Sequence, residues 1–176
     1  SRSGSCACGW PTRASRSVAT TKTATEGRAA RLARFRWSAS IAATLAYVLA
    51  EAGARRCFGV LGTANFAITH ALTQNGVKYL PAMHEAQAVM MAFGYAHANN
   101  ERAIASLHSG PGLTNALTAI AEAAKSKAPM LVLAGDVANG DLKNNFHFEQ
   151  AEMVRSVGAV AERIYSPATA LDDFTR

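Results

Sequence analysis

The stretch RAIASLHSGPGLTNALTAIAEAAKS, residues 102–126, changes from a strand pattern to a helix pattern within a few residues. Residues 102–108 form a short apolar run, which predicts a buried β-strand. Residues 112–126 are rich in alanine and leucine at helical spacing, which predicts an α-helix. The corner between them is polar and rich in glycine, so we expect the chain to turn sharply there.

The same alternation of strand and helix extends on both sides of this stretch. We expect strands at residues 56–62, 77–82, 102–108, 128–135 and 159–166. We expect helices at residues 38–52 (with Ser38 or Ser40 as N-cap), 65–75, 84–98 and 112–126, a polar loop at 136–147, a short helix after it, and the start of another helix at 170–176. This βαβ spacing predicts an α/β fold, a three-layer α/β/α domain with a mainly parallel central sheet.

Length and composition fit one globular domain. The chain has 176 residues, of which 49% are hydrophobic and 17% charged. No apolar run approaches the ~18–20 residues needed to cross a bilayer, so we expect no membrane partner. The three cysteines, Cys6, Cys8 and Cys57, have neither zinc nor redox spacing. A reducing cytoplasm is therefore the expected location.

The net charge of +6 comes from the N-terminal part of the chain. Residues 1–37 hold eight basic residues and one acidic residue, whereas residues 38–176 hold ten basic and eleven acidic residues. The segment 1–37 is rich in Ser, Thr, Ala and Arg, a composition that predicts a disordered basic tail. We expect the domain to span residues 38–176. Its C-terminus is expected to be truncated if residues 170–176 are the opening of a longer helix. The tail resembles a transit peptide, which would give an organellar location, or a non-native upstream segment. No aromatic-rich basic surface follows it, so we expect no nucleic-acid partner.

Three polar clusters follow three of the expected strands. His84–Glu85 comes after residues 77–82, the segment 108–115 after the third strand, and the segment 135–150 after the fourth. Ligands of open parallel sheets bind beyond the carboxyl ends of the strands. The clusters are therefore candidates for one shared site.

Spacing excludes several familiar motifs at these clusters. The helical zinc-protease motif needs a second histidine four residues after His84, where this chain has Ala88. Gly110-Pro111-Gly112 lacks the third glycine of a dinucleotide fingerprint, and no P-loop lysine follows. Ser109 lacks the flanking glycines of a nucleophile elbow, so we expect it to form a turn or cap a helix.

A hydrolase built on Ser109, His108 and Asp136 is a further alternative. Adjacent side chains on a strand point to opposite faces, so we expect His108 to be unable to serve Ser109. The sequence thus disfavours this alternative.

Taken in order, the motifs resemble one known family. The segments are FGVLGTAN (58–65), HEAQAVMMAFGYA (84–96), LHSGPGLTNALTAIAEA (107–123), APMLVLAGD (128–136) and FHFEQAEMVRSVGA (146–159). This set resembles the N-terminal, pyrimidine-binding domain of thiamine-diphosphate-dependent enzymes. The similar branch contains acetolactate synthase, benzoylformate decarboxylase and related enzymes of 2-oxo acids. The resemblance covers about residues 40–176.

The resemblance implies a role for Glu85 in activating thiamine diphosphate. In that family the matching glutamate hydrogen-bonds N1′ of the aminopyrimidine ring and helps the 4′ nitrogen to remove the thiazolium C2 proton. A carboxylate shielded from water suits this sharing of a proton. The thiazolium then serves as the electron sink when a 2-oxo acid loses CO₂.

The resemblance also implies roles for the neighbouring loops. The residues expected near the cofactor are Gly62, Gly110, Pro111, Gly112 and Asn115. His108 resembles a histidine of the benzoylformate decarboxylase branch that transfers protons, which favours a decarboxylase or carboligase. Phe148, Glu149 and Gln150 resemble the synthase segment Phe-Gln-Glu, with the polar pair reversed, and are candidate substrate-binding residues. Leu61 stands where the family commonly has proline.

The resemblance further implies partners. The family holds the diphosphate and Mg²⁺ through Gly-Asp-Gly and a later Asn in a C-terminal domain, whereas here Val137 replaces the second glycine. We therefore expect no metal site in residues 135–145 and no activity from this chain alone. It implies a homodimer or homotetramer of a longer chain, or a complementary diphosphate-binding subunit. The alternative is a non-catalytic, truncated or degenerate module for cofactor binding or oligomerisation.

Overall fold

Four parallel strands form one sheet in the computed structural model, which describes residues 40–138, 141, 143–166 and 168–175. The strands are β1 (Arg56–Gly59), β2 (Lys78–Pro81), β3 (Ala103–Leu107) and β4 (Met130–Ala134). Their order in the sheet is β2-β1-β3-β4, and every neighbouring pair is parallel. Each strand lies within a range that the sequence predicts.

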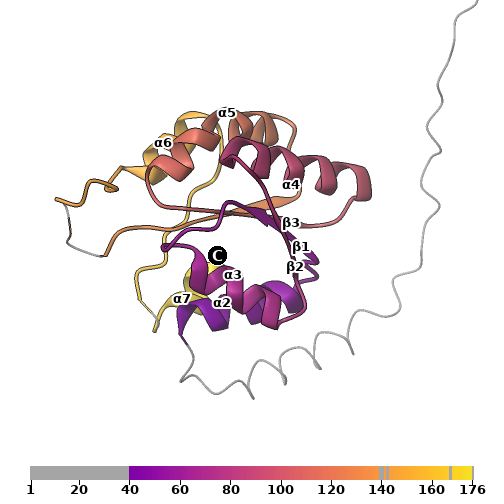
Figure 1. The fold of residues 1–176 in the computed structure, drawn as a ribbon, viewed down its shortest axis with the longest axis horizontal. Helices are drawn as coiled ribbons and strands as arrows, with labels where there is room; N and C mark the ends of the chain where they lie inside the picture. Colours follow the sequence, from indigo (N-terminus) through magenta and orange to yellow (C-terminus); the bar gives the residue numbers. More distant parts are fainter. Residues whose placement is uncertain (1–39, 139–140, 142, 167, 176) are drawn as a thin grey trace, which may run out of the picture. The chain divides into compact units, whose positions relative to one another are not determined.

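Helices cover both faces of this sheet. They are α2 (Ile41–Glu51), α3 (Phe66–Gln74), α4 (Glu85–Asn99), α5 (Pro111–Lys125), α6 (Gln150–Ser156) and α7 (Ala170–Thr175). Figure 1 shows α4, α5 and α6 on one face of the sheet and α2, α3 and α7 on the other. The predicted three-layer α/β/α architecture with a parallel central sheet is confirmed.

The core consists of two apolar layers, one on each face of the sheet. All five residues of β3 are buried, because the strand lies between β1 and β4 and is covered on both faces. Beneath α4, Ala88, Ala92 and Ala96 recur every four residues and are fully buried in the same cluster as Leu107. This spacing puts small side chains on one helix face, which lets α4 approach the sheet and α5 closely. The opposite layer includes Leu72 and Ile104.

Local sequence explains where the helices that carry the site begin. The Ser40 Oγ accepts a hydrogen bond from Ala43 N at 3.4 Å and caps α2 as predicted. His84 caps α4, because its Nδ1 accepts from Ala86 N at 3.2 Å. Gly110 is the N-cap of α5, with Pro111 at the first helical position. Of the two roles predicted for Ser109, a turn or a helix cap, the turn is confirmed, and the cap is Gly110.

One predicted strand is absent from the described residues. Residues 159–166 form no ladder with the sheet, and Val160 is 90% exposed. Side chains hold this segment instead: Arg155 Nη2 donates to Ala161 O at 3.0 Å, and Arg163 pairs with Asp136 at 2.9 Å. The prediction of a strand is wrong here, because an alternating apolar pattern gives no information on whether an edge strand is available for pairing.

The predicted basic tail of residues 1–37, the domain start at residue 38 and two of the cysteines lie outside the described residues. Cys57 is free and buried. Among the described residues, no helix has the length and apolar character that a membrane crossing requires.

Candidate functional site

The carboxyl ends of the four parallel strands meet at one edge of the sheet. The loops that follow β1, β2 and β3 contain Gly62, His84 and His108, and Gly135 follows β4. All three polar clusters that the sequence singles out therefore lie at the edge where ligands of open parallel sheets bind. The helices α4 and α5 start directly from this edge.

Glu85 is the first residue of α4 and is oriented by a residue of α5. The Asn115 Nδ2 donates a hydrogen bond to Glu85 Oε2 at 3.1 Å. The Oε1 atom faces Gly112, since a Cβ added at Gly112 would lie 3.7 Å from it. Among the described residues, Oε1 has no hydrogen-bond partner. One carboxylate oxygen is thus held by Asn115, and the other lies beside the backbone of Gly112.

His108 lies against the same glycine, next to Glu85. A Cβ added at Gly112 would lie 2.9 Å from the His108 Cβ, and one added at Gly62 would overlap the imidazole ring. The His108 Nε2 is 3.2 Å from Thr63 Oγ1. Its ring packs on Phe146 with centroids 5.4 Å apart. The fold therefore brings together Gly62, Glu85, His108, Gly112 and Asn115, which are separated by up to 53 residues in the sequence.

The neighbouring Ser109 corrects one of the predictions. Strand β3 ends at Leu107, so His108 and Ser109 lie in the turn and need not point to opposite faces. The Ser109 Oγ is 3.2 Å from His108 Nδ1, contrary to expectation. A hydrolase is still not assembled, because Ser109 is 3% exposed and the Asp136 carboxylate binds Arg163 and Val137 N. A nucleophile needs access to its substrate and a base oriented by a third group.

Asn65 holds the Gly62 loop and was not singled out by the sequence. Its Oδ1 accepts from Gly62 N at 2.8 Å, and its Nδ2 donates to Val60 O and Ser106 Oγ, both at 3.1 Å. Thr69 Oγ1 completes the network at 2.9 Å from Ser106 Oγ. Asn65 is 1% exposed and is the N-cap of α3, yet its side chain makes no capping bond. In the sequence, Asn65 stands at the start of a helix and just after a glycine loop. That position predicts a helix cap, and it does not predict that the Asn65 side chain binds the Gly62 loop.

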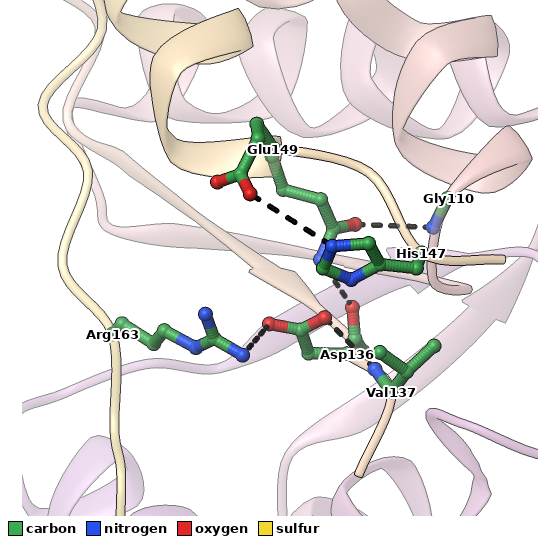
Figure 2. A network of polar contacts seen from close by, with 8 residues as sticks. Gly110, Asp136, Val137, His147, Glu149 and Arg163 are labelled. Atoms are coloured by element: carbon green, nitrogen blue, oxygen red, sulfur yellow. Dashed lines mark hydrogen bonds and ion pairs between the residues drawn. The ribbon is translucent and has the colours of Figure 1, made fainter. Parts of the chain in front are cut away.

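The three candidate substrate-binding residues lie at or beside the start of α6. The Phe148 ring packs on Gly110, since a Cβ there would lie 2.9 Å from Phe148 Cδ2. Gln150 Oε1 accepts from Gly110 N at 3.1 Å, and its Nε2 donates to Gly135 O at 3.0 Å. The Glu149 carboxylate is 79% exposed and lies 3.8 Å from His147 Nε2 (Figure 2). Phe148 and Gln150 thus reach the predicted cofactor-facing corner, whereas Glu149 points away from it.

Across the described parts of the chain, no group of three or more His, Cys, Asp or Glu side chains is arranged to hold a metal ion. Asp136 is engaged by Arg163 and by the backbone of its own loop.

Comparisons with known proteins identify relatives. The chain is 39% identical over 107 residues to the acetolactate synthase isozyme 3 large subunit of Escherichia coli strain K12, a match that covers 60% of this chain and 18% of that protein. It is 31% identical over 123 residues to the sulfoacetaldehyde acetyltransferase of Rhodobacter capsulatus, covering 69% of this chain and 21% of that protein. The chain thus spans about a fifth of the length of the curated relatives that it matches.

A solved structure has the same fold. It is an X-ray structure of a protein from Mycobacterium smegmatis described as a thiamin diphosphate-dependent enzyme, with a TM-score of 0.58 and 22% identity. The match covers 65% of this chain and 22% of that one. The family profile described as "Thiamine pyrophosphate enzyme, N-terminal TPP binding domain" matches residues 39–157. The chain therefore belongs to the thiamine pyrophosphate enzyme family, as its N-terminal, thiamine-diphosphate-binding domain.

Proposed function

We propose that this chain binds the aminopyrimidine part of thiamine diphosphate through Glu85 and is part of an enzyme that decarboxylates or joins small 2-oxo acids. The observation that supports this most directly is the half-held carboxylate of Glu85. Asn115 orients Oε2 at 3.1 Å, and Oε1 lies beside Gly112. An acceptor that is fixed in direction and left open to a ligand suits a protonated ring nitrogen.

Gly112 lets His108 and Glu85 lie close together at the start of α5. A Cβ at Gly112 would lie 2.9 Å from the His108 Cβ, which is too close for a side chain, and 3.7 Å from Glu85 Oε1. A first-turn glutamate also complements the helix dipole, which is worth about 0.3–1 kcal/mol. That effect acts through the charge alone and requires no asparagine from a second helix. The contact with Asn115 therefore favours a binding role over a purely electrostatic one.

Glu85 has a defined chemical task in this proposal. When bound, thiamine diphosphate supplies a thiazolium that stores the electron pair released from a 2-oxo acid. Glu85 Oε1 holds a proton at the ring nitrogen that it meets. Asn115 keeps the carboxylate turned toward that nitrogen by donating to Oε2. Gly62, Gly110, Pro111 and Gly112 are the proposed backbone neighbours of the cofactor, and the three glycines also let the side chains of His108 and Phe148 pack closely on the backbone.

His108 is the proposed proton-transfer residue for the substrate. Its Nε2 lies 3.2 Å from Thr63 Oγ1 and its Nδ1 3.2 Å from Ser109 Oγ, so both ring nitrogens have hydroxyl partners that accommodate either tautomer. Phe148, which packs on Gly110, is proposed for the substrate side of the site, and Gln150 lies at the same corner, where it accepts from Gly110 N. Similarity to acetolactate synthase and to a probable 2-ketoarginine decarboxylase supports a 2-oxo acid as the substrate class.

The proposal includes a second protein part. The diphosphate and its Mg²⁺ are held by another domain or by a complementary subunit, within a homodimer or homotetramer of the complete protein, in the cytoplasm. The relatives' greater length supports this, since the chain matches only 18–21% of two of them. The second candidate function is a non-catalytic module that binds cofactor or mediates oligomerisation. It is kept because the chain matches only about a fifth of the length of the curated relatives.

The test uses the assembly that contains this chain with its diphosphate-binding part. Glu85→Gln keeps the size of the side chain and removes the acid. Turnover of a 2-oxo acid such as pyruvate should fall by about 10²–10⁴, the range for losing an acid–base group, while calorimetric binding of thiamine diphosphate changes less. Gln74→Ala, at an exposed position of α3, is the matched control. Full turnover in Glu85→Gln would contradict the proposed function, and no turnover in the unsubstituted assembly would support the non-catalytic candidate.

A further inference from the structure

We infer that Gln150 is a positioning residue, whose side-chain amide joins Gly110 to Gly135 and thereby fixes the corner that orients Asn115 toward Glu85. The inference rests on the proposed function, in which this corner faces the cofactor. It assigns Gln150 a role distinct from substrate contact.

The amide of Gln150 uses both of its polar ends. Its Oε1 accepts from Gly110 N at 3.1 Å, and its Nε2 donates to Gly135 O at 3.0 Å. The orientation of the amide is fixed by its partners, because a backbone N–H only donates and a carbonyl only accepts. Figure 2 shows the hydrogen bond at Gly110 N and, beside it, the loop of Asp136 and Val137. We name the pair of hydrogen bonds the Gln150 clamp.

The two glycines in the clamp are each packed against another loop. Gly110 has φ +57°, and a Cβ there would lie 2.7 Å from Phe146 O. A Cβ at Gly135 would lie 2.6 Å from the Ala64 Cβ. The clamp therefore connects the loops after β3 and β4 with the start of α6, and the loop after β1 packs on Gly135 through Ala64. Glutamate at position 150 would lack the donor for Gly135 O, and alanine would be too short to reach either partner.

The corner held by the clamp is the beginning of α5. Gly110 O accepts from Leu113 N at 3.0 Å and from Thr114 N at 3.1 Å. A displacement of Gly110 would therefore move the first turn of α5, which contains Gly112 and leads to Asn115. Asn115 donates to Glu85 Oε2. Gln150 thus acts on Glu85 through α5 and not by contact, which makes it a positioning residue.

The first test uses NMR on the unsubstituted 176-residue chain and needs no variant. The side-chain amide of Gln150 should give resolved, slowly exchanging proton signals with nuclear Overhauser contacts to Gly135, and the Gly110 amide should be protected. Gln74, which is exposed on α3, is the internal reference. Averaged Gln150 signals like those of Gln74 would overturn the inference, whether or not the chain binds thiamine diphosphate.

The second test compares Gln150→Glu with Gln150→Ala. In Gln150→Ala, exchange of the Gly110 amide should accelerate by about tenfold, and the Asn115 side-chain signals should shift. In Gln150→Glu, the same changes should occur at pH 7 and reverse as the pH falls through about 4–5, because a protonated carboxyl can donate to Gly135 O and accept from Gly110 N. Gln74→Glu is the charge-matched control and should show no reversal.

The outcomes separate a positioning role from a general structural role. A residue that only secured α6 would lower the melting temperature without moving the Asn115 signals, and this result would overturn the inference. In the complete assembly, Gln150→Ala should weaken binding of thiamine diphosphate by about tenfold, as expected from loss of a positioned hydrogen-bond partner. Failure of the unsubstituted assembly to bind thiamine diphosphate would refute the proposed function, while the NMR result would still decide whether the clamp exists.

Discussion

Replacing Asn65 with alanine should destabilise the domain by about 3 kcal/mol. The side chain makes three hydrogen bonds, to Gly62 N, Val60 O and Ser106 Oγ, and it is 1% exposed. A hydrogen bond contributes about 1 kcal/mol net, and a buried group left without a partner costs about 1–3 kcal/mol. Ser106 Oγ keeps Thr69 as a partner, so the main loss is at the two backbone groups. The Asn65 side chain makes no capping hydrogen bond, so the substitution removes no hydrogen bond from the start of α3.

Urea unfolding of the 176-residue chain, followed by circular dichroism, measures this loss. In a chain of this size, 3 kcal/mol corresponds to a fall in melting temperature of roughly 6–12 °C. Asn75→Ala is the matched control on the same helix, since its amide donates to Ala71 O at 2.8 Å but is exposed to water. It should lose no more than about 0.5 kcal/mol, as is usual at exposed positions. Equal losses in the two variants would refute the conclusion that Asn65 anchors the Gly62 loop.

Two other results are expected. In the complete assembly, His108→Ala should reduce turnover by about 10²–10⁴ with little change in cofactor affinity, and unchanged turnover with a lower melting temperature would show that His108 is structural. Burial raises the pKa of the Cys57 thiol from 9.0 to about 12. The contribution of the buried, neutral Cys57 thiol to the free energy of unfolding is therefore fully present below pH 9, and it is lost as the pH rises toward 12. Urea titrations between pH 8 and pH 10.5 should show a decline that is smaller in Cys57→Ala, and identical declines would contradict this.

Much of the fold could be predicted from the sequence because it depends on local patterns. The four strands and the helices between them follow apolar runs and stop signals, and parallel pairing follows from their alternation. The segment 159–166 has a similar pattern, but Arg155 and Arg163 hold it away from any ladder. Contacts between side chains that are far apart in the sequence leave no pattern in the neighbouring residues from which they could be predicted.

For the candidate site, the sequence predicts which residues lie at the same edge of the sheet, but it does not predict the contacts between their side chains. The residues expected near the cofactor follow successive strands, and parallel strands bring them to one edge. The contact between Glu85 and Asn115 joins residues 30 positions apart on two helices, and the Gln150 clamp joins the loops after β3 and β4. The expected strand 102–108 includes His108, whereas β3 ends at Leu107, so the sequence does not predict the distance of 3.2 Å between Ser109 Oγ and His108 Nδ1.

The most direct test of the central claim is the rate at which bound thiamine diphosphate exchanges its C2 proton for deuterium. It is measured by NMR after rapid acid quench in the assembly that contains this chain and its diphosphate-binding part. Because Glu85 Oε1 is the only proposed group that holds a proton at the ring nitrogen, Glu85→Gln should slow exchange by about 10²–10⁴ while most of the bound cofactor is retained. Exchange in Glu85→Gln at the unsubstituted rate, with cofactor bound, would contradict the account.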